Sequence, residues 1–250
     1  MTEPRQFILC GHRGNIAEAA ENTLASFASA ERVGVDEIEL DVKVTLDGAL
    51  VVIHDRTVDR TAATPTPFRT IPVEELTLAQ LRTVDLGDGQ RVPTFEEALE
   101  ATSVLLQVEI KSSDAALPLA RLLRSRGEHD RTRCVITSFD ALSLADFASE
   151  WPNSPRGLAL HVPNVDTNWR EQVRRLGVST VYIPLSIVTR EIVDELHEDG
   201  YLVGASLIEN PGDVRRVVEL DIDGSASNAP ALARRMLEHN DEFTSRFPSF

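Results

Sequence analysis

Ionisable residues stand two apart inside two strongly apolar segments of the chain. Glu39 and Asp41 are separated by one leucine, and Glu109 and Lys111 by one isoleucine. Side chains alternate between the faces of a strand, so each pair points to one side if these segments are strands. Two carboxylates on one buried strand face are unfavourable unless a cation or hydrogen-bond donors meet them. The spacing therefore predicts a polar site on an otherwise apolar sheet.

Two histidines accompany these pairs. His12, followed by Arg13, ends the first apolar segment, and His54 ends another short apolar segment after Asp41. Near neutral pH, a histidine pair can accept and donate protons. Arginine offers a planar fork to phosphate oxygens, and Lys111 offers a point charge. The combination predicts a phosphate site with acid–base chemistry, without indicating which histidine is the acid and which the base.

Three carboxylates with few competing ligands suit one hard divalent cation, Mg²⁺ or Ca²⁺. We expect Glu39, Asp41 and Glu109 to bind it, because zinc sites usually contain more histidine or cysteine. The alternative is structural: Glu39 and Asp41 could pair with basic side chains inside the fold, and Glu109 with Lys111.

Elements that could position these residues alternate along the chain as strand and helix. Strands are expected at 7–11, 37–44, 104–110, 134–138, 156–160, 180–184, 201–207 and 222–225, each followed by a helical segment. Eight such units in 250 residues predict an α/β fold of the (β/α)8 TIM barrel type, occupying residues 1–250 as one domain. An open doubly wound sheet is the alternative, but no Gly-x-Gly-x-x-Gly turn follows the first strand. Active-site groups of barrels lie at the carboxyl ends of strands, where the residues named above should meet.

One stretch interrupts the alternation. Residues 50–88 contain a short strand, a loop rich in proline and threonine, and a small helix near 76–82. We interpret it as a small insertion after strand 2, at about residues 50–90, lying over the mouth of the barrel.

Composition narrows the possible partners and location. The net charge is −15, and no cluster of basic residues offers a nucleic-acid surface. Cys10 and Cys134 lie in apolar segments and are expected to be buried, reduced thiols. No signal pattern or apolar span is present, so we expect a cytoplasmic protein without stable membrane insertion. The oligomeric state stays open.

Short motifs then resemble the glycerophosphodiester phosphodiesterase family over nearly the whole chain. They are His12-Arg13-Gly14, Glu21-Asn22-Thr23, Glu39-Leu40-Asp41-Val42, Asp47-Gly48, Val52-Ile53-His54-Asp55, Asp59-Arg60-Thr61, Val92-Pro93-Thr94-Phe95-Glu96-Glu97, Val108-Glu109-Ile110-Lys111 and Ser138-Phe139-Asp140. The resemblance implies a (β/α)8 barrel that hydrolyses glycerophosphodiesters, small-molecule substrates, to glycerol 3-phosphate and an alcohol. It implies catalytic roles for His12 and His54, and divalent-metal ligation by Glu39, Asp41 and Glu109. It also places Arg13 and Lys111 near the phosphate.

The C-terminal third departs from the family pattern. Ser206 stands where the family often has tryptophan, Glu209 where it has asparagine, and Asn228 where it has aspartate. We expect a more open and more acidic pocket wall if Glu209 faces the mouth. Alternatively, Glu209 caps the helix that begins near Pro211.

Two other functions remain open at this point. A lysophospholipase D or sphingomyelinase D-like enzyme would use the same histidines and metal, with Phe68, Ile71 and Leu76 as an apolar rim on the insertion. A non-catalytic barrel that binds phosphodiesters is the second alternative, although pure binding needs no pair of proton-transfer groups.

Overall fold

The computed structural model of the protein describes residues 6–161, 168–248 and 250. Eight parallel strands close into a barrel in the order β1-β9-β8-β7-β6-β5-β4-β2, with β1 pairing again to β2. Their bounds are β1 Ile8–Gly11, β2 Glu37–Val44, β4 Leu105–Ile110, β5 Cys134–Ser138, β6 Arg156–Ala159, β7 Thr180–Pro184, β8 Leu202–Ser206 and β9 Gly224–Ser227. The predicted TIM barrel is confirmed.

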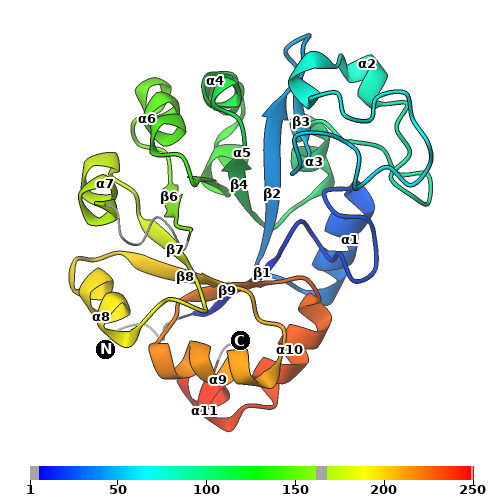
Figure 1. Cartoon of the computed structure of the whole chain (residues 1–250). Coiled ribbons are helices and arrows are strands. Elements are labelled where there is room, and N and C mark those ends of the chain that lie inside the picture. The colour runs from blue at the N-terminus through cyan, green and yellow to red at the C-terminus, as the bar shows by residue number, and fades with distance from the viewer. Residues whose placement is uncertain (1–5, 162–167, 249) are drawn as a thin grey trace.

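Helices surround the barrel (Figure 1). The main ones are α1 Leu24–Val33, α3 Phe95–Ala101, α4 Ala116–Ser125, α6 Ala141–Glu150, α7 Trp169–Leu176, α8 Arg190–Glu198, α9 Pro211–Leu220 and α10 Pro230–Glu238. Outward-facing strand residues such as Leu9, Leu40 and Val108 are completely buried against them. The inward-facing positions carry both apolar residues, such as Ile8 and Leu105, and polar ones, such as Glu39.

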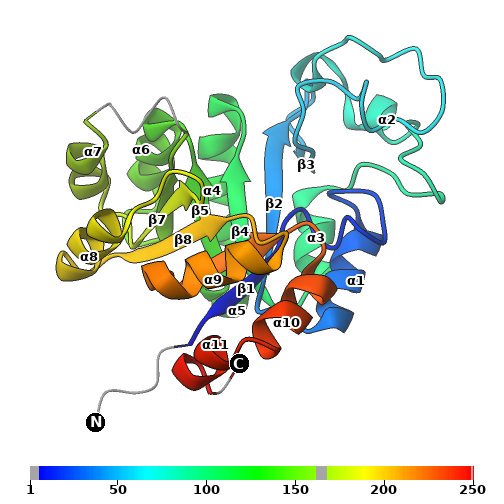
Figure 2. The same ribbon diagram turned by 60° about the horizontal axis from the view of Figure 1, so that its bottom comes forward.

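The insertion after strand 2 is also confirmed. It contains β3 (Leu50–Val52), the 3₁₀ turn η1 (Val73–Glu75) and α2 (Leu78–Leu81). β3 runs antiparallel to the last residues of β2, which extends the sheet beyond the barrel. Figure 2 shows the insertion beside the end of the barrel towards which β2 and β4 point. It has a separate apolar cluster that includes Val51, Leu76 and Leu81.

Outside the insertion, three short elements of the described residues were not expected from the sequence. They are η2 (Ser113–Ala115), α5 (Glu128–Thr132) and α11 (Asp241–Arg246). Asn240 is the N-cap of α11, and its side chain accepts a hydrogen bond from the backbone N–H of Phe243. The Phe243 ring packs edge-on against Phe7, with 5.1 Å between ring centres. Tertiary packing of aromatic rings thus stabilises a helix too short to be predicted from periodicity.

Candidate active site

Three carboxylates meet on the inner faces of β2 and β4. The register of the two strands places Asp41 beside Glu109, and Glu39 points to the same side as Asp41. Oxygens of Glu39, Asp41 and Glu109 all lie within 4.8 Å of one another. Glu39 is 4% exposed and Asp41 is fully buried. The same-face spacing read from the sequence therefore produces one compact acidic cluster.

This cluster is electrostatically strained in the protein alone. Burial and the neighbouring carboxylates raise the pKa of Glu39 well above its usual range. Burial likewise raises the pKa of Glu109 to about 7, although Lys111 opposes the shift. Without a further cation, the cluster therefore holds protons near neutral pH.

Two basic side chains face the carboxylates. The Arg13 Nε lies 3.4 Å from an oxygen of Asp41, and the backbone N–H of Arg13 donates to Glu39 at 2.9 Å. The Lys111 ammonium lies 2.6 Å from Glu109 and 3.3 Å from Asp41. Burial alone would lower the pKa of Lys111, but Asp41 and Glu109 outweigh it and raise the pKa. Arg13 and Lys111 thus hold fixed positive charges at the edge of the cluster.

A hard divalent cation fits this donor set. The site offers carboxylate oxygens within reach of one ion, and oxygen ligands are what Mg²⁺ and Ca²⁺ prefer. Oδ1 of Asp41 is buried and accepts no hydrogen bond, although the Lys111 ammonium is nearby. Asn22 donates to the other oxygen of Asp41 at 2.7 Å. This oxygen therefore has an ion-pair contact but no hydrogen bond, and it can serve as a ligand for a cation.

The two histidines stand at the same mouth but in different surroundings. His12 Nδ1 lies 2.7 Å from the amide oxygen of Asn228, and burial lowers its pKa. His54 Nδ1 lies 2.7 Å from a carboxylate oxygen of Asp55. The Arg60 guanidinium, bonded to Asp55 at 2.7 Å, lowers the pKa of Asp55 to about 2. His12 thus faces a neutral partner and His54 an ionised one.

Two further residues of the family-like motifs, Glu21 and Arg60, connect these groups. Glu21 accepts hydrogen bonds from Arg13 at 3.0 Å and from Arg60 at 2.6 Å. Arg60 lies in the insertion, so Glu21 ties that segment to the strand-end residues. Both Glu21 and Arg60 belong to the motifs that resemble the family. Their positions in the sequence, however, do not indicate that the two side chains form a pair.

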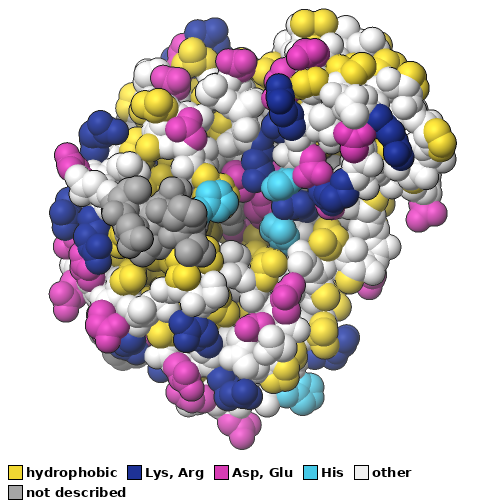
Figure 3. All heavy atoms as spheres, in the orientation of Figure 1, with side chains coloured by type: hydrophobic (Ala, Val, Ile, Leu, Met, Phe, Trp, Pro, Cys, Tyr) yellow, Lys and Arg dark blue, Asp and Glu magenta, His cyan; other side chains and the backbone are white. Residues whose placement is uncertain are grey.

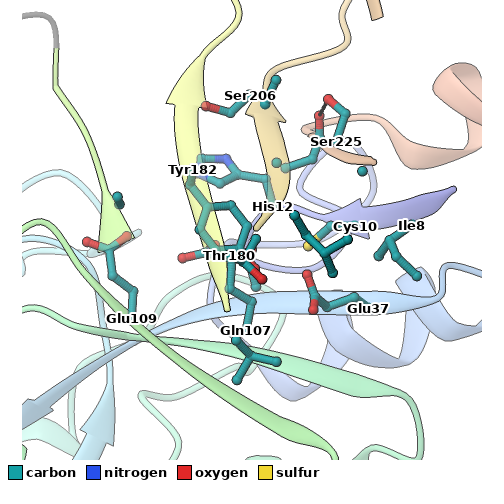
Figure 4. Close-up of a pocket in the computed structure, with 18 of the residues that line it drawn as sticks. Ile8, Cys10, His12, Glu37, Gln107, Glu109, Thr180, Tyr182, Ser206 and Ser225 are labelled. Atoms are coloured by element: carbon teal, nitrogen blue, oxygen red, sulfur yellow. Dashed lines mark hydrogen bonds between the residues drawn. The ribbon is translucent and has the colours of Figure 1, made fainter. Parts of the chain in front are cut away.

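The site opens into a cavity of about 470 Å³ inside the barrel. Figure 3 shows histidine, acidic and basic side chains bordering a hollow on this face. Below the mouth the lining includes Cys10, Glu37 and Tyr182, which approach one another in Figure 4.

Cys10 and Cys134 are free and buried, as predicted. Burial raises the pKa of Glu37 to about 7.

Residues from the second half of the barrel complete the mouth, and one of them, His161, was not predicted as a site residue. Its ring stacks on Phe139 with 3.6 Å between centres, and both line the cavity. The Lys111 ammonium lies 5.6 Å from the Phe139 ring centre. The signal available in the sequence was the position of His161 just after a predicted strand.

Glu209 does not cap the helix after it, so that expectation was wrong. Asn210 is the N-cap of α9, and Asp213 completes a capping box with it. The exposed Glu209 side chain instead accepts a hydrogen bond from the amide nitrogen of Asn228 at 3.2 Å. Ser206 lines the cavity at the position where a larger side chain was expected in the family.

Comparison with known proteins agrees with this architecture. The model of the glycerophosphoryl diester phosphodiesterase family matches residues 12–232. A glycerophosphodiester phosphodiesterase of Caldanaerobacter subterraneus is 31% identical over 236 residues, covering 89% of this chain and 94% of the relative. A Mycobacterium tuberculosis protein named probable glycerophosphodiester phosphodiesterase 1 is 43% identical over 256 aligned positions, covering 91% of each chain.

A solved structure shows the same fold at lower identity. It is an Oleispira antarctica phosphodiesterase in complex with the product sn-glycerol-3-phosphate, with a TM-score of 0.83 and 24% identity. The match covers 92% of this chain and 96% of the other. With the family model spanning most of the sequence, the chain belongs to the glycerophosphoryl diester phosphodiesterase family and is a phosphoric diester hydrolase.

Proposed function

We propose that this protein hydrolyses glycerophosphodiesters to glycerol 3-phosphate and an alcohol, using a divalent cation and the pair His12 and His54. The observation that carries the proposal is the meeting of three buried carboxylates, two fixed cations and two differently partnered histidines at one barrel mouth. The names of the relatives, and the product bound in the Oleispira structure, support this substrate class.

The charge of the site suits the substrate. Glu39, Asp41 and Glu109 would hold one Mg²⁺ or Ca²⁺, which supplies Lewis-acid polarisation of a phosphoryl oxygen. With the ion and the charges of Arg13 and Lys111, the ionised site has one net positive charge. A phosphodiester carries one negative charge, so the two are complementary. Arg13 can donate to phosphate oxygens through its guanidinium, whose position Glu21 fixes.

The partners of the two histidines suggest that one acts as a base and the other as an acid. Burial keeps His12 neutral, and its Nδ1 is bonded to Asn228, so Nε2 is the nitrogen available to accept a proton. The ionised Asp55 stabilises positive charge that develops on the His54 ring and accepts its Nδ1–H. We therefore propose His12 as the base that deprotonates the nucleophile and His54 as the acid that protonates the departing alcohol.

The structure gives the lipid alternative no support. Leu76 is 1% exposed, and Phe68 and Ile71 pack against the insertion's own apolar cluster. These residues are therefore the core of the insertion and do not form an apolar rim. A non-catalytic barrel gives no reason for one histidine to have a neutral partner and the other an ionised one.

A substrate panel followed by ³¹P NMR tests this function. Glycerophosphocholine and a lysophospholipid should be compared after the purified protein has been supplied with Mg²⁺, Ca²⁺ or Mn²⁺. We expect a phosphomonoester signal from glycerophosphocholine, identified as glycerol 3-phosphate, and a much weaker one from the lysophospholipid. The absence of phosphomonoester from every diester would overturn the proposal, and preference for the lysophospholipid would overturn its substrate class.

A further inference from the structure

A line of side chains leads from His12 to the outside of the barrel. His12 follows β1, Asn228 follows β9, and Glu209 follows β8. The His12 Nδ1 and Asn228 Oδ1 lie 2.7 Å apart, and Asn228 Nδ2 donates to Glu209 Oε1 at 3.2 Å. Three strand ends that are neighbours in the closed barrel thus share one hydrogen-bonded chain.

The orientation of the Asn228 amide group affects which nitrogen of the His12 ring carries the proton. An asparagine side chain has an accepting oxygen and a donating nitrogen that exchange places when the amide turns over. A carboxylate only accepts, so Glu209 selects the orientation in which Nδ2 faces outward. Oδ1 then faces His12 and can only accept, which requires the proton of the neutral ring to lie on Nδ1.

We propose that Glu209 is a positioning residue that fixes the Asn228 amide and thereby the Nδ1–H tautomer of His12. Its effect on turnover rests on the proposed function, in which His12 Nε2 accepts a proton. Without Glu209, the amide is free to turn Nδ2 toward His12, which favours the opposite tautomer and blocks Nε2. The fraction of protein with a competent base then falls.

The expected effect on turnover is modest, because Glu209 is exposed. Loss of one such hydrogen bond should lower kcat about three- to tenfold. KM should stay nearly constant, since Glu209 acts through the state of His12. A purely structural role would instead lower stability or change both parameters.

Three variants separate the steps of this chain. Glu209→Leu removes the acceptor, and Glu209→Gln retains an oxygen that can accept. The double variant Glu209→Leu with Asn228→Asp supplies His12 with an accepting oxygen that needs no outside partner. Glu219→Leu, on the exposed side of α9, is the matched control.

The experiment records the side-chain ¹⁵N shifts of His12 at alkaline pH, where its ring is neutral, in each variant. The signals are assigned by their loss in His12→Gln, and kcat and KM are measured beside them. We expect Nδ1 protonation in the wild type and the control, and a tautomer mixture with reduced kcat in Glu209→Leu. The Nδ1–H form should be largely retained in Glu209→Gln and regained in the double variant.

A wild-type ring protonated on Nε2 would overturn the proposal, and so would an unchanged tautomer in Glu209→Leu. The NMR signature does not depend on turnover. A tautomer change in protein that hydrolyses no phosphodiester would therefore refute the proposed function while supporting the role of Glu209.

Discussion

The two halves of the barrel mouth are built differently. At the ends of β1, β2 and β4, charged residues are buried and bonded to one another, as in the contacts of Asp41 with Arg13 and Lys111. At the ends of β6, β8 and β9 stand His161, Ser206 and Asn228, none of which carries a fixed charge, and the nearby acid Glu209 is exposed. In the function proposed above, the first half therefore holds the groups for bond cleavage, and the second half shapes and orients them.

This difference has an energetic basis. Burying several charges is tolerated only where each has partners, which restricts the residue types that can stand in the first half. The second half needs only the right shape and hydrogen bonds, so many side chains would satisfy it. Variants in the two halves should accordingly differ in the size and in the kind of their effects.

The largest effect should come from the acidic cluster. Asp41→Asn removes a charge from the centre of the proposed metal site, so cation binding should weaken and hydrolysis should fall below detection. Calorimetric titration of the chelator-treated protein with Mg²⁺ and Ca²⁺ measures the binding. Asp114→Asn, at an exposed position, is the control and should bind as the wild type does. Undiminished cation binding by Asp41→Asn would remove this residue from the site.

The second-largest loss of activity should come from substitution of His12 or His54. His12→Ala and His54→Ala each remove a proton-transfer group, so kcat should fall on the order of 10²–10⁴-fold with an intact fold. Circular dichroism and steady-state kinetics check both statements. His239→Ala, whose ring is exposed and bonded only to the backbone of Arg235 among the described residues, should retain full activity. Normal turnover in either active-site variant would exclude that histidine from catalysis.

Glu37, a buried acid at the first residue of β2, allows a test based on stability. Glu37 is 6% exposed, and its pKa is about 7 in the folded protein against an ordinary value of 4.5. The unfolded chain therefore releases this proton first as pH rises, and the free energy of unfolding falls between those two values. The loss should be about 3 kcal/mol.

Glu37→Gln should therefore stabilise the protein above neutral pH and change little near pH 4.5. Urea unfolding of both proteins at several pH values measures this difference. Glu198→Gln, on an exposed turn of α8, should show no such trend. A constant difference between Glu37→Gln and wild type across the range would contradict the buried-acid account.

The smallest effect should come from the aromatic wall. Phe139→Ala removes the ring that stacks on His161 and lies near Lys111. A contact of this kind is worth about 0.5–1 kcal/mol, so kcat/KM should fall about two- to fivefold, mostly through KM. Leu142→Ala, at an exposed position of α6, serves as control. A loss as large as that of a histidine variant would show that the second half takes part in the chemistry.

The contrast between the halves also explains what the sequence could predict. Glu39, Asp41 and Glu109 lie on strands whose period of two fixes their direction, and Lys111 directly follows β4, so their convergence followed once the barrel was inferred. Several strand bounds agree with the expected ones, including β2 and β7.

The remaining contacts depend on closure of the barrel. The pairing of His12 with Asn228 joins residues 216 positions apart, and that of Arg60 with Glu21 depends on how the insertion folds back. No local pattern encodes either contact. The same reason explains why Glu209 was expected to cap a helix: its bond to Asn228 exists only because β8 and β9 are neighbours.

The central claim is that the first half of the mouth is a cation-assisted phosphodiesterase site. Its most direct test is a titration of chelator-treated protein with Mg²⁺, Ca²⁺ or Mn²⁺ while ³¹P NMR records hydrolysis of glycerophosphocholine. The account predicts no hydrolysis before the cation is added, and a rate that rises to saturation with one of these ions. A full rate in protein verified to be free of metal would contradict it.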